Sequence, residues 1–124
     1  MTAPLEFVVK DVKRAKTVGD PADSSASATA QGEFIIIDMT VRNISNEVQT
    51  YFTGSQKLVA AGKHYGDSTD AELYLPNSEL TSQINPGSMI DTAVAFDVPE
   101  GTEPDALEVH DFAFSPGATV PINH

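Results

Sequence analysis

One stretch of the chain constrains the fold more than any other, because its apolar residues recur at every second position. The stretch is Glu33–Asn43. A period of two is the pattern of a β-strand, whose alternate side chains point to opposite faces of a sheet. A slip of one residue would carry charged side chains into the core, so the register is well specified. The inner face is predicted to hold Ile35, Ile37, Met39 and Val41, and the outer face Asp38, Thr40 and Arg42.

The early part of this strand departs from the simple alternation. Phe34 and Ile36 fall on the outer face, where a half-exposed strand would carry polar residues. A strand that is apolar on both faces is usually covered on both. We therefore predict that another part of the chain packs over the outer face near these two residues.

A second alternating run, Ser88–Val98, lies between two turn signals, Asn85–Gly87 and Pro99–Gly101. Leu5–Lys13 and Ala106–Phe114 alternate in part and are also predicted to be strands. About seven strands separated by turns are typical of a sandwich or a small barrel. No helix is predicted. The shorter predicted strands are Val48–Phe52, Lys57–Ala60 and Glu72–Leu75.

The segment Thr17–Gln31 is low in complexity, being rich in alanine, serine, threonine and aspartate. Such a composition contributes little to a core. We therefore predict a long flexible loop there, between the first two strands. A chain of 124 residues suits one domain, so residues 1–124 are predicted to form a single unit.

The charge of the chain excludes two classes of partner. Seven Lys and Arg stand against 18 Asp and Glu, which gives a formal net charge of −11. Every Lys and Arg lies between Lys10 and Lys63. Nucleic acid and anionic membrane surfaces would be repelled. The favoured interpretation is solubility, with an acidic surface for a cationic partner as the alternative.

The chain has no cysteine, which excludes disulfides, thiol nucleophiles and cysteine metal sites. No run approaches the roughly 18 apolar residues of a membrane span, so no direct membrane insertion is predicted. Met1–Pro4 shows no signal peptide. We therefore expect either an intracellular protein or a mature segment.

The three histidines do not have the spacing of a zinc site such as H-E-x-x-H. We predict that His64, His110 and His124 are unrelated surface side chains. A blue-copper site would also need a cysteine thiolate. A Met/His copper site is disfavoured because Met39 is better explained as core packing on a strand face. The remaining members of such a site would be Met89 and His110.

Nucleophilic catalysis has no sequence support, because no G-x-S-x-G elbow is present. Gly54–Ser55 and Ser115–Gly117 are predicted to be turn residues. Asp67–Glu72 offers three carboxylates, but it lacks the EF-hand pattern for calcium. An acidic surface loop with no ion is therefore predicted. No catalytic, cofactor-binding or metal-binding residue is assigned, and the chain is predicted not to be an enzyme.

Three motifs of the chain, taken in order, resemble the DUF4352 family. Gly32–Asn43 resembles its "G-x-φ-φ-φ-φ-x-φ-x-V-x-N" opening, and Lys57–Tyr65 its "F-x-L-x-D-x-x-G-x-x-Y" segment. Asn85–Gly87 followed by Val94–Pro99 is similar to its "N-P-G … φ-x-F-x-V-P" ending. The resemblance covers roughly residues 5 to 114. It departs from the family pattern at Ala60–Ala61, where an acidic residue is often seen.

The resemblance implies an immunoglobulin-like β-sandwich, of the superfamily of MPT63-type secreted antigens. Such domains are commonly extracellular in Gram-positive bacteria, often behind a lipoprotein signal, and no catalytic residue is established for the family. The motif residues also have structural roles of their own. Asn43 is predicted to bond to a nearby turn backbone. Gly62 and Gly87 are predicted to adopt positive φ.

The sequence therefore predicts a non-catalytic, immunoglobulin-like domain that is extracellular or associated with the cell envelope. Lipid anchoring through a removed N-terminal segment would fit the resemblance. The predicted role is protein interaction or structure, with another protein bound through the end loops. No cofactor is predicted. The alternative is a metal or small-ligand binding protein that uses His64, His110 or Asp67–Glu72.

Overall fold

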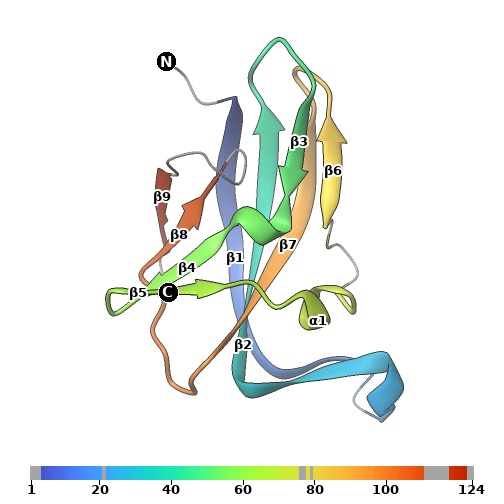
Figure 1. Cartoon of the computed structure of the whole chain (residues 1–124), viewed down its shortest axis with the longest axis vertical. Helices are drawn as coiled ribbons and strands as arrows, with labels where there is room; N and C mark the ends of the chain where they lie inside the picture. Colours follow the sequence, from blue (N-terminus) through green and yellow to red (C-terminus); the bar gives the residue numbers. More distant parts are fainter. Residues whose placement is uncertain (1–3, 21, 76–77, 79, 111–117, 123–124) are drawn as a thin grey trace.

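The structure is a computed structural model that describes residues 4–20, 22–75, 78, 80–110 and 118–122 (Figure 1). Its helical elements are three single turns: η1 (Ser24–Ala26), η2 (Thr53–Ser55) and α1 (Thr69–Glu72). None of the helices in these ranges is long and apolar enough to cross a membrane. The strands are β1 (Leu5–Gly19), β2 (Ser27–Asn43), β3 (Gln49–Phe52), β4 (Lys57–Ala60), β5 (Lys63–Gly66), β6 (Thr81–Ile84), β7 (Met89–Val98), β8 (Ala106–Val109) and β9 (Ala118–Pro121).

The strands form three antiparallel sheets, with the orders β1-β2-β7, β3-β6 and β5-β4-β8-β9. The first sheet is one layer of a sandwich, and β4 crosses in front of β1 and β2 in Figure 1. This is the predicted immunoglobulin-like β-sandwich. The part of the chain described holds nine strands rather than about seven, because β5, β6 and β9 were not predicted. The predicted strand Glu72–Leu75 is wrong: it begins at the end of α1 and continues into a turn.

The main core lies between the layers and confirms the predicted inner face of β2. Its register places Ile37 between Val12 of β1 and Val94 of β7. Each predicted inner residue of β2 is at most 1% exposed. Burial of this kind contributes roughly 1.5–3 kcal/mol for each large apolar side chain. The buried members of the main core are Leu5, Ile35, Ile37, Met39, Val41, Tyr51, Leu58, Ile84, Val94, Phe96, Val98, Leu107, Val109 and Ile122.

A second core lies on the outer face of β2 and β7, as the apolar outer residues predicted. Phe34 and Ile36 are 2% and 7% exposed. They are covered by residues 68–75, which include α1 and which we call the α1 segment. Ala71 of this segment is buried, and Tyr74 and Leu75 pack alongside it. The buried members of this second core are Val18, Ala30, Phe34, Ile36, Ala71, Ala93 and Ala95.

The predicted loop at Thr17–Gln31 is wrong, because most of it is strand. β1 continues to Gly19, β2 begins at Ser27, and the two remain paired at Thr17 with Thr29. Between them η1 is capped by Asp23, whose side chain accepts a hydrogen bond from the Ser25 amide. The hairpin is ordered by the second core, to which it contributes two buried side chains, Val18 and Ala30. Low complexity therefore did not mean low order here.

Candidate functional site

At one end of the sandwich, the β2–β3 connection and the β6–β7 turn are tied together by Asn43. Its side chain is fully buried, and its Nδ2 donates hydrogen bonds to the carbonyls of Glu47 (2.7 Å) and Ile84 (2.8 Å). Its Oδ1 accepts from the Ser45 amide at 2.9 Å. The Gly87 amide donates to the Asn43 carbonyl at 2.9 Å. The predicted bonding of Asn43 to turn backbone is confirmed, and so is the positive φ of Gly87.

The same end exposes three large apolar side chains, which we call the apolar end. Ile44 and Val48 belong to the β2–β3 connection, and Met89 begins β7 after the β6–β7 turn. Their exposed fractions are 46%, 52% and 57%. Figure 1 shows the two connections side by side at the end of the molecule. Because hydrogen bonds fix the loops, these side chains form a surface that loses little freedom when a partner binds.

The Asp67–Glu72 segment is not the exposed acidic loop that its composition predicted. The Ser68 hydroxyl accepts a hydrogen bond from the Ala71 amide and caps α1 at its start. Glu72 then turns inward and is only 2% exposed. Its Oε2 accepts from the Ala95 amide of β7 at 3.1 Å.

Glu72 lies close to two other oxygen-bearing side chains. Burial, and then the neighbouring Asp67 carboxyl, raise the pKa of Glu72 to about 9. Burial also raises the pKa of Tyr51 above its ordinary value, and Glu72 and Asp67 raise it further. Glu72 Oε1 and Tyr51 Oη are shielded from solvent. The protonated Glu72 carboxyl is hydrogen bonded to Asp67, and the Tyr51 hydroxyl interacts with Thr53.

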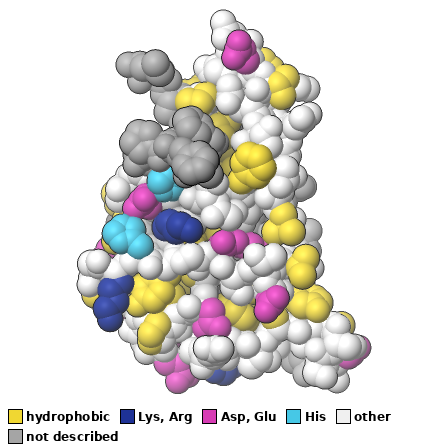
Figure 2. All heavy atoms as spheres, in the orientation of Figure 1, with side chains coloured by type: hydrophobic (Ala, Val, Ile, Leu, Met, Phe, Trp, Pro, Cys, Tyr) yellow, Lys and Arg dark blue, Asp and Glu magenta, His cyan; other side chains and the backbone are white. Residues whose placement is uncertain are grey.

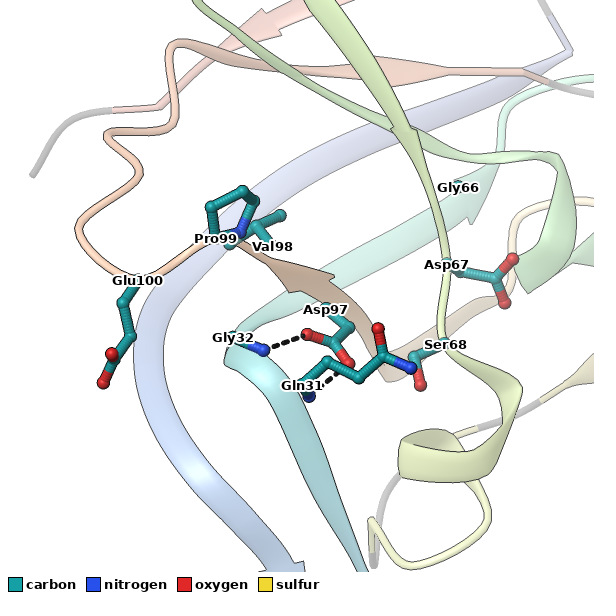
Figure 3. A pocket seen from close by; sticks show the side chains of 9 residues that line it. All are labelled: Gln31, Gly32, Gly66, Asp67, Ser68, Asp97, Val98, Pro99 and Glu100. Atoms are coloured by element: carbon teal, nitrogen blue, oxygen red, sulfur yellow. Dashed lines mark hydrogen bonds between the residues drawn. The ribbon is translucent and has the colours of Figure 1, made fainter.

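A shallow hollow of about 700 Å³ opens next to this segment (Figure 3). Asp97 of β7 accepts hydrogen bonds from the amides of Gln31 (2.9 Å) and Gly32 (3.1 Å). Figure 3 shows the Asp67 side chain pointing away from Asp97, so the two carboxylates do not converge. Gly32 is required here because a Cβ would collide with the Val98 carbonyl. The groups that line the hollow thus stabilise the contact between β2 and β7 at this point.

The prediction that the histidines are unrelated is wrong for His64 and His110, because both contact Glu108, although His64 lies on the surface as predicted. His64 Nε2 lies 3.0 Å from Glu108 Oε2, and His110 Nε2 lies 2.8 Å from Glu108 Oε1. The His110 side chain is only 12% exposed, whereas it was expected to face solvent. Figure 2 shows two histidines and an acidic side chain together on this face. Strand pairing brings His64 to Glu108, because β4 lies between β5 and β8. His110 follows Glu108 by two residues in the chain.

The structure does not assemble the metal sites that were considered. In the described ranges, no group of three or more His, Asp or Glu side chains is arranged to hold a metal ion. Met39 is buried in the main core, as predicted, and Met89 lies on the opposite face of β2 and β7. Gly54–Ser55 lies in η2. His124, Ser115–Gly117 and the end of the predicted strand Ala106–Phe114 fall outside the described residues.

A family model, "Domain of unknown function (DUF4352)", matches residues 2–119. The chain belongs to this family. The predicted resemblance is confirmed, and the match spans nearly all of the elements above. A comparison with curated proteins finds no match.

Several solved structures share the fold. The yjhA protein from Bacillus subtilis has a TM-score of 0.68 and 15% identity, covering 91% of this chain and 79% of its own. The ycdA protein of Bacillus subtilis, named a "putative lipoprotein", has a TM-score of 0.66 and 20% identity; 96% of this chain matches 36% of that one. MPT63, a secreted protein from Mycobacterium tuberculosis, has a TM-score of 0.63 and 20% identity, covering 86% and 74%.

Glu72 is the residue that composition misplaced, although a local signal for its helix was present. Ser68 is a preferred N-cap residue, and acidic residues follow in the next turn, at Asp70 and Glu72. That pattern indicates the start of a helix rather than a strand or an open loop. The inward direction of the Glu72 side chain depends on the free edge of β7, and no local sequence pattern reveals that edge.

Proposed function

We propose that this chain is a non-catalytic module that works outside the cytoplasm, secreted or bound to the cell envelope, and binds another protein. Two proteins with the same fold support the location, one named a secreted protein and one a "putative lipoprotein". The net charge of −11 suits a protein that stays soluble at high concentration.

The observation that carries the binding role is the apolar end. Ile44, Val48 and Met89 are about half exposed on loops that Asn43 fixes in place. Exposed apolar groups on rigid end loops are typical of recognition surfaces in sandwich domains. The partner would cover these three side chains.

The non-catalytic character is supported by how the reactive side chains are used. Ser68 caps a helix turn. Asp97 binds two backbone amides, and Glu72 binds a third. His110 and His64 both face the Glu108 carboxylate. These groups stabilise the fold, and in the described residues none of them forms a nucleophile–base pair across the hollow.

The experiment is crosslinking on intact cells with a reagent that does not cross membranes. The wild-type chain is expected to yield a specific crosslinked protein, and Ile44→Asp is expected to lose it, because a charge would be buried at the interface. Leu73→Asp is the matched control. Leu73 is 61% exposed and lies on the α1 segment, away from the apolar end.

Two results would contradict the proposal. One is the absence of any crosslinked protein on intact cells when lysed cells give one, which would place the chain inside. The other is a crosslinked protein that Ile44→Asp retains as fully as Leu73→Asp does. Both variants change exposed side chains, so their circular dichroism spectra should match that of the wild type.

A further inference from the structure

The first part of β1 is a free sheet edge. Among the described strands, β2 is the only one that pairs with β1. The Ile44 amide donates to the Pro4 carbonyl at 3.0 Å, so alternate residues from Pro4 to Val8 turn their backbone groups toward β2 in an antiparallel ladder. The amide and carbonyl groups of Phe7 and Val9 therefore point away from β2, where such unpaired groups are a template for another strand.

The second part of β1 is protected, and the first part is not. Bulges interrupt the pairing with β2 after Val9 and after Ala15. Between them, Arg14 donates to the Thr102 carbonyl of the β7–β8 connection at 2.7 Å. Bulges and charged side chains both keep sheet edges from pairing. Glu6–Val9 has a continuous register with β2, so it is the part of the edge that can take another strand.

The apolar side chains of this segment are incompletely covered. Phe7 and Val9 pack against the main core but are only partly buried there, and Val8 on the outer face is 49% exposed. The Phe7 ring lies against Tyr51, with 6.4 Å between the ring centroids. A strand added beside β1 would bury more of Phe7, Val8 and Val9, because neighbouring strands lie only about 4.8 Å apart.

The exposed charges of the same segment have opposite signs. Glu6 and Lys10 lie two residues to either side of Val8. Lys10 shares the outer face with Val8, because its Nζ reaches across β2 to Asp91 at 3.2 Å. That ion pair is 53% and 58% exposed, so water screens it and it holds Lys10 only weakly. In two antiparallel copies of this segment centred on Val8, each Glu6 would lie opposite a Lys10, which is a favourable cross-strand pair.

We propose that the Glu6–Lys10 edge of β1 binds the same edge of a second copy of this chain, as antiparallel strands related by a two-fold axis at Val8. In this register Phe7 of each copy lies opposite Val9 of the other, and the two residues exchange backbone hydrogen bonds. A contact of this kind is self-complementary and closes at two copies. Its surface is separate from the apolar end, so this proposal and the proposed function can fail independently.

The first test is sedimentation equilibrium of the whole chain from micromolar to millimolar concentration. Physiological salt is needed because each copy carries a net charge of −11, whose repulsion is then screened beyond about 8 Å. The wild type is expected to shift from the mass of one chain to twice that mass. Val8→Asp should remain a monomer, because two carboxylates would face each other at the axis. Val48→Asp is the matched control: Val48 is 52% exposed at the apolar end, and its variant should dimerise as the wild type does.

A charge exchange tests the register. Lys10→Glu should weaken the dimer about tenfold, because both symmetric charge pairs become repulsive. The double variant Glu6→Lys with Lys10→Glu should restore the dimer. Lys63→Glu is the control, because it makes the same change of net charge at an exposed residue of β5 and should leave the dimer intact.

A single cysteine locates the axis. The chain has no cysteine, so Val8→Cys carries one thiol, which should form a disulfide between copies under oxidising conditions. Glu6→Cys should not, because the two Cα atoms at this position would lie roughly 13 Å apart along the strands, beyond the limit of about 7 Å for a disulfide.

The proposal is overturned if the wild type remains a monomer throughout, or if Val8→Asp dimerises as well as Val48→Asp does. It is also overturned if the charge exchange fails to restore the dimer that Lys10→Glu weakens, or if Glu6→Cys crosslinks as readily as Val8→Cys. A dimer that only Val48→Asp disrupts would place the contact at the apolar end and not at β1.

Discussion

The two cores of this molecule lie on opposite faces of the same strand, and they are built differently. Ile37 belongs to the main core and its neighbour Ile36 to the second core. The main core draws large apolar side chains from all three sheets and contains no alanine among its buried members. Four of the seven buried members of the second core are alanines. Alanine buries little area, so the second core gains less from the hydrophobic effect.

Polar contacts offset part of the smaller hydrophobic stabilisation of the second core. β7 is the edge of its sheet, and an edge strand has unpaired backbone groups. The Ser68 amide and the Glu72 carboxyl bind the backbone of Ala95, and the Ser78 hydroxyl donates to the Ala93 carbonyl at 3.2 Å. The α1 segment therefore covers the free edge of β7 as well as the outer face. This cover introduces a buried carboxyl, which the main core avoids.

The largest expected effect comes from the two neighbouring isoleucines. Ile37→Ala should lower the free energy of unfolding by about 4 kcal/mol, because a large buried side chain is lost from a core that cannot collapse. Ile36→Ala should lower the free energy of unfolding by about 2 kcal/mol, because the side chains around Ile36 are small and the second core is shallow. Urea unfolding measures both. Equal losses would mean that the second core is as tightly packed as the main one.

The next effect concerns the pH dependence of stability. The folded pKa of Glu72 is about 9, against 4.5 for an unperturbed glutamate. Between these values the folded chain keeps a proton that the unfolded chain releases, so raising the pH favours unfolding. The free energy of unfolding should fall by at most about 1.4 kcal/mol for each pH unit from about 4.5 to 9.

Glu72→Gln provides the control for this slope, because it cannot ionise. Its stability should match that of the wild type near pH 5 and exceed it near pH 8. Asp70→Asn, on the same helix, should keep the wild-type slope. A wild-type slope that persists in Glu72→Gln would show that another group titrates.

Much of the fold could be predicted from the sequence, because one strand carried the signal for both cores. The alternation in Glu33–Asn43 fixed the inner face, and Phe34 and Ile36 indicated the cover on the outer face. The hairpin ends at Thr17–Gln31 were missed because Ala, Ser and Thr have weak preferences that tertiary contacts override. β6, with the sequence Thr-Ser-Gln-Ile, carries a single large apolar residue, Ile84, and so gave no alternation to detect.

The polar sites were less predictable, for a different reason. The predicted role of Asn43 was right because its partners lie mostly in the adjacent turn. The contact of His64 with Glu108 depends on which strands pair across β4, and strand order is not a local property. His110 follows Glu108 by only two residues, so that contact is local and was missed although its partner is near. The burial of Glu72 depends on the free edge of β7, more than 20 residues away in the sequence. Local patterns identified Asn43, whose partners are near in sequence, and missed His64 and Glu72, whose partners are distant.

The smallest expected effect comes from the same Glu→Gln change made where solvent has access. Glu108 is 27% exposed and faces His64, which is 57% exposed, and His110. Ion pairs with this much exposure contribute little because water screens them, and glutamine can still hydrogen bond to an imidazole. Glu108→Gln should therefore change the free energy of unfolding at pH 7 by less than about 1 kcal/mol, as urea unfolding would show. A loss as large as that of Ile36→Ala would mean that the contacts of Glu108 with the two histidines stabilise the β5-β4-β8 sheet as strongly as the second core stabilises α1. In that case, the difference in burial between the Glu72 and Glu108 carboxyls would not govern stability here.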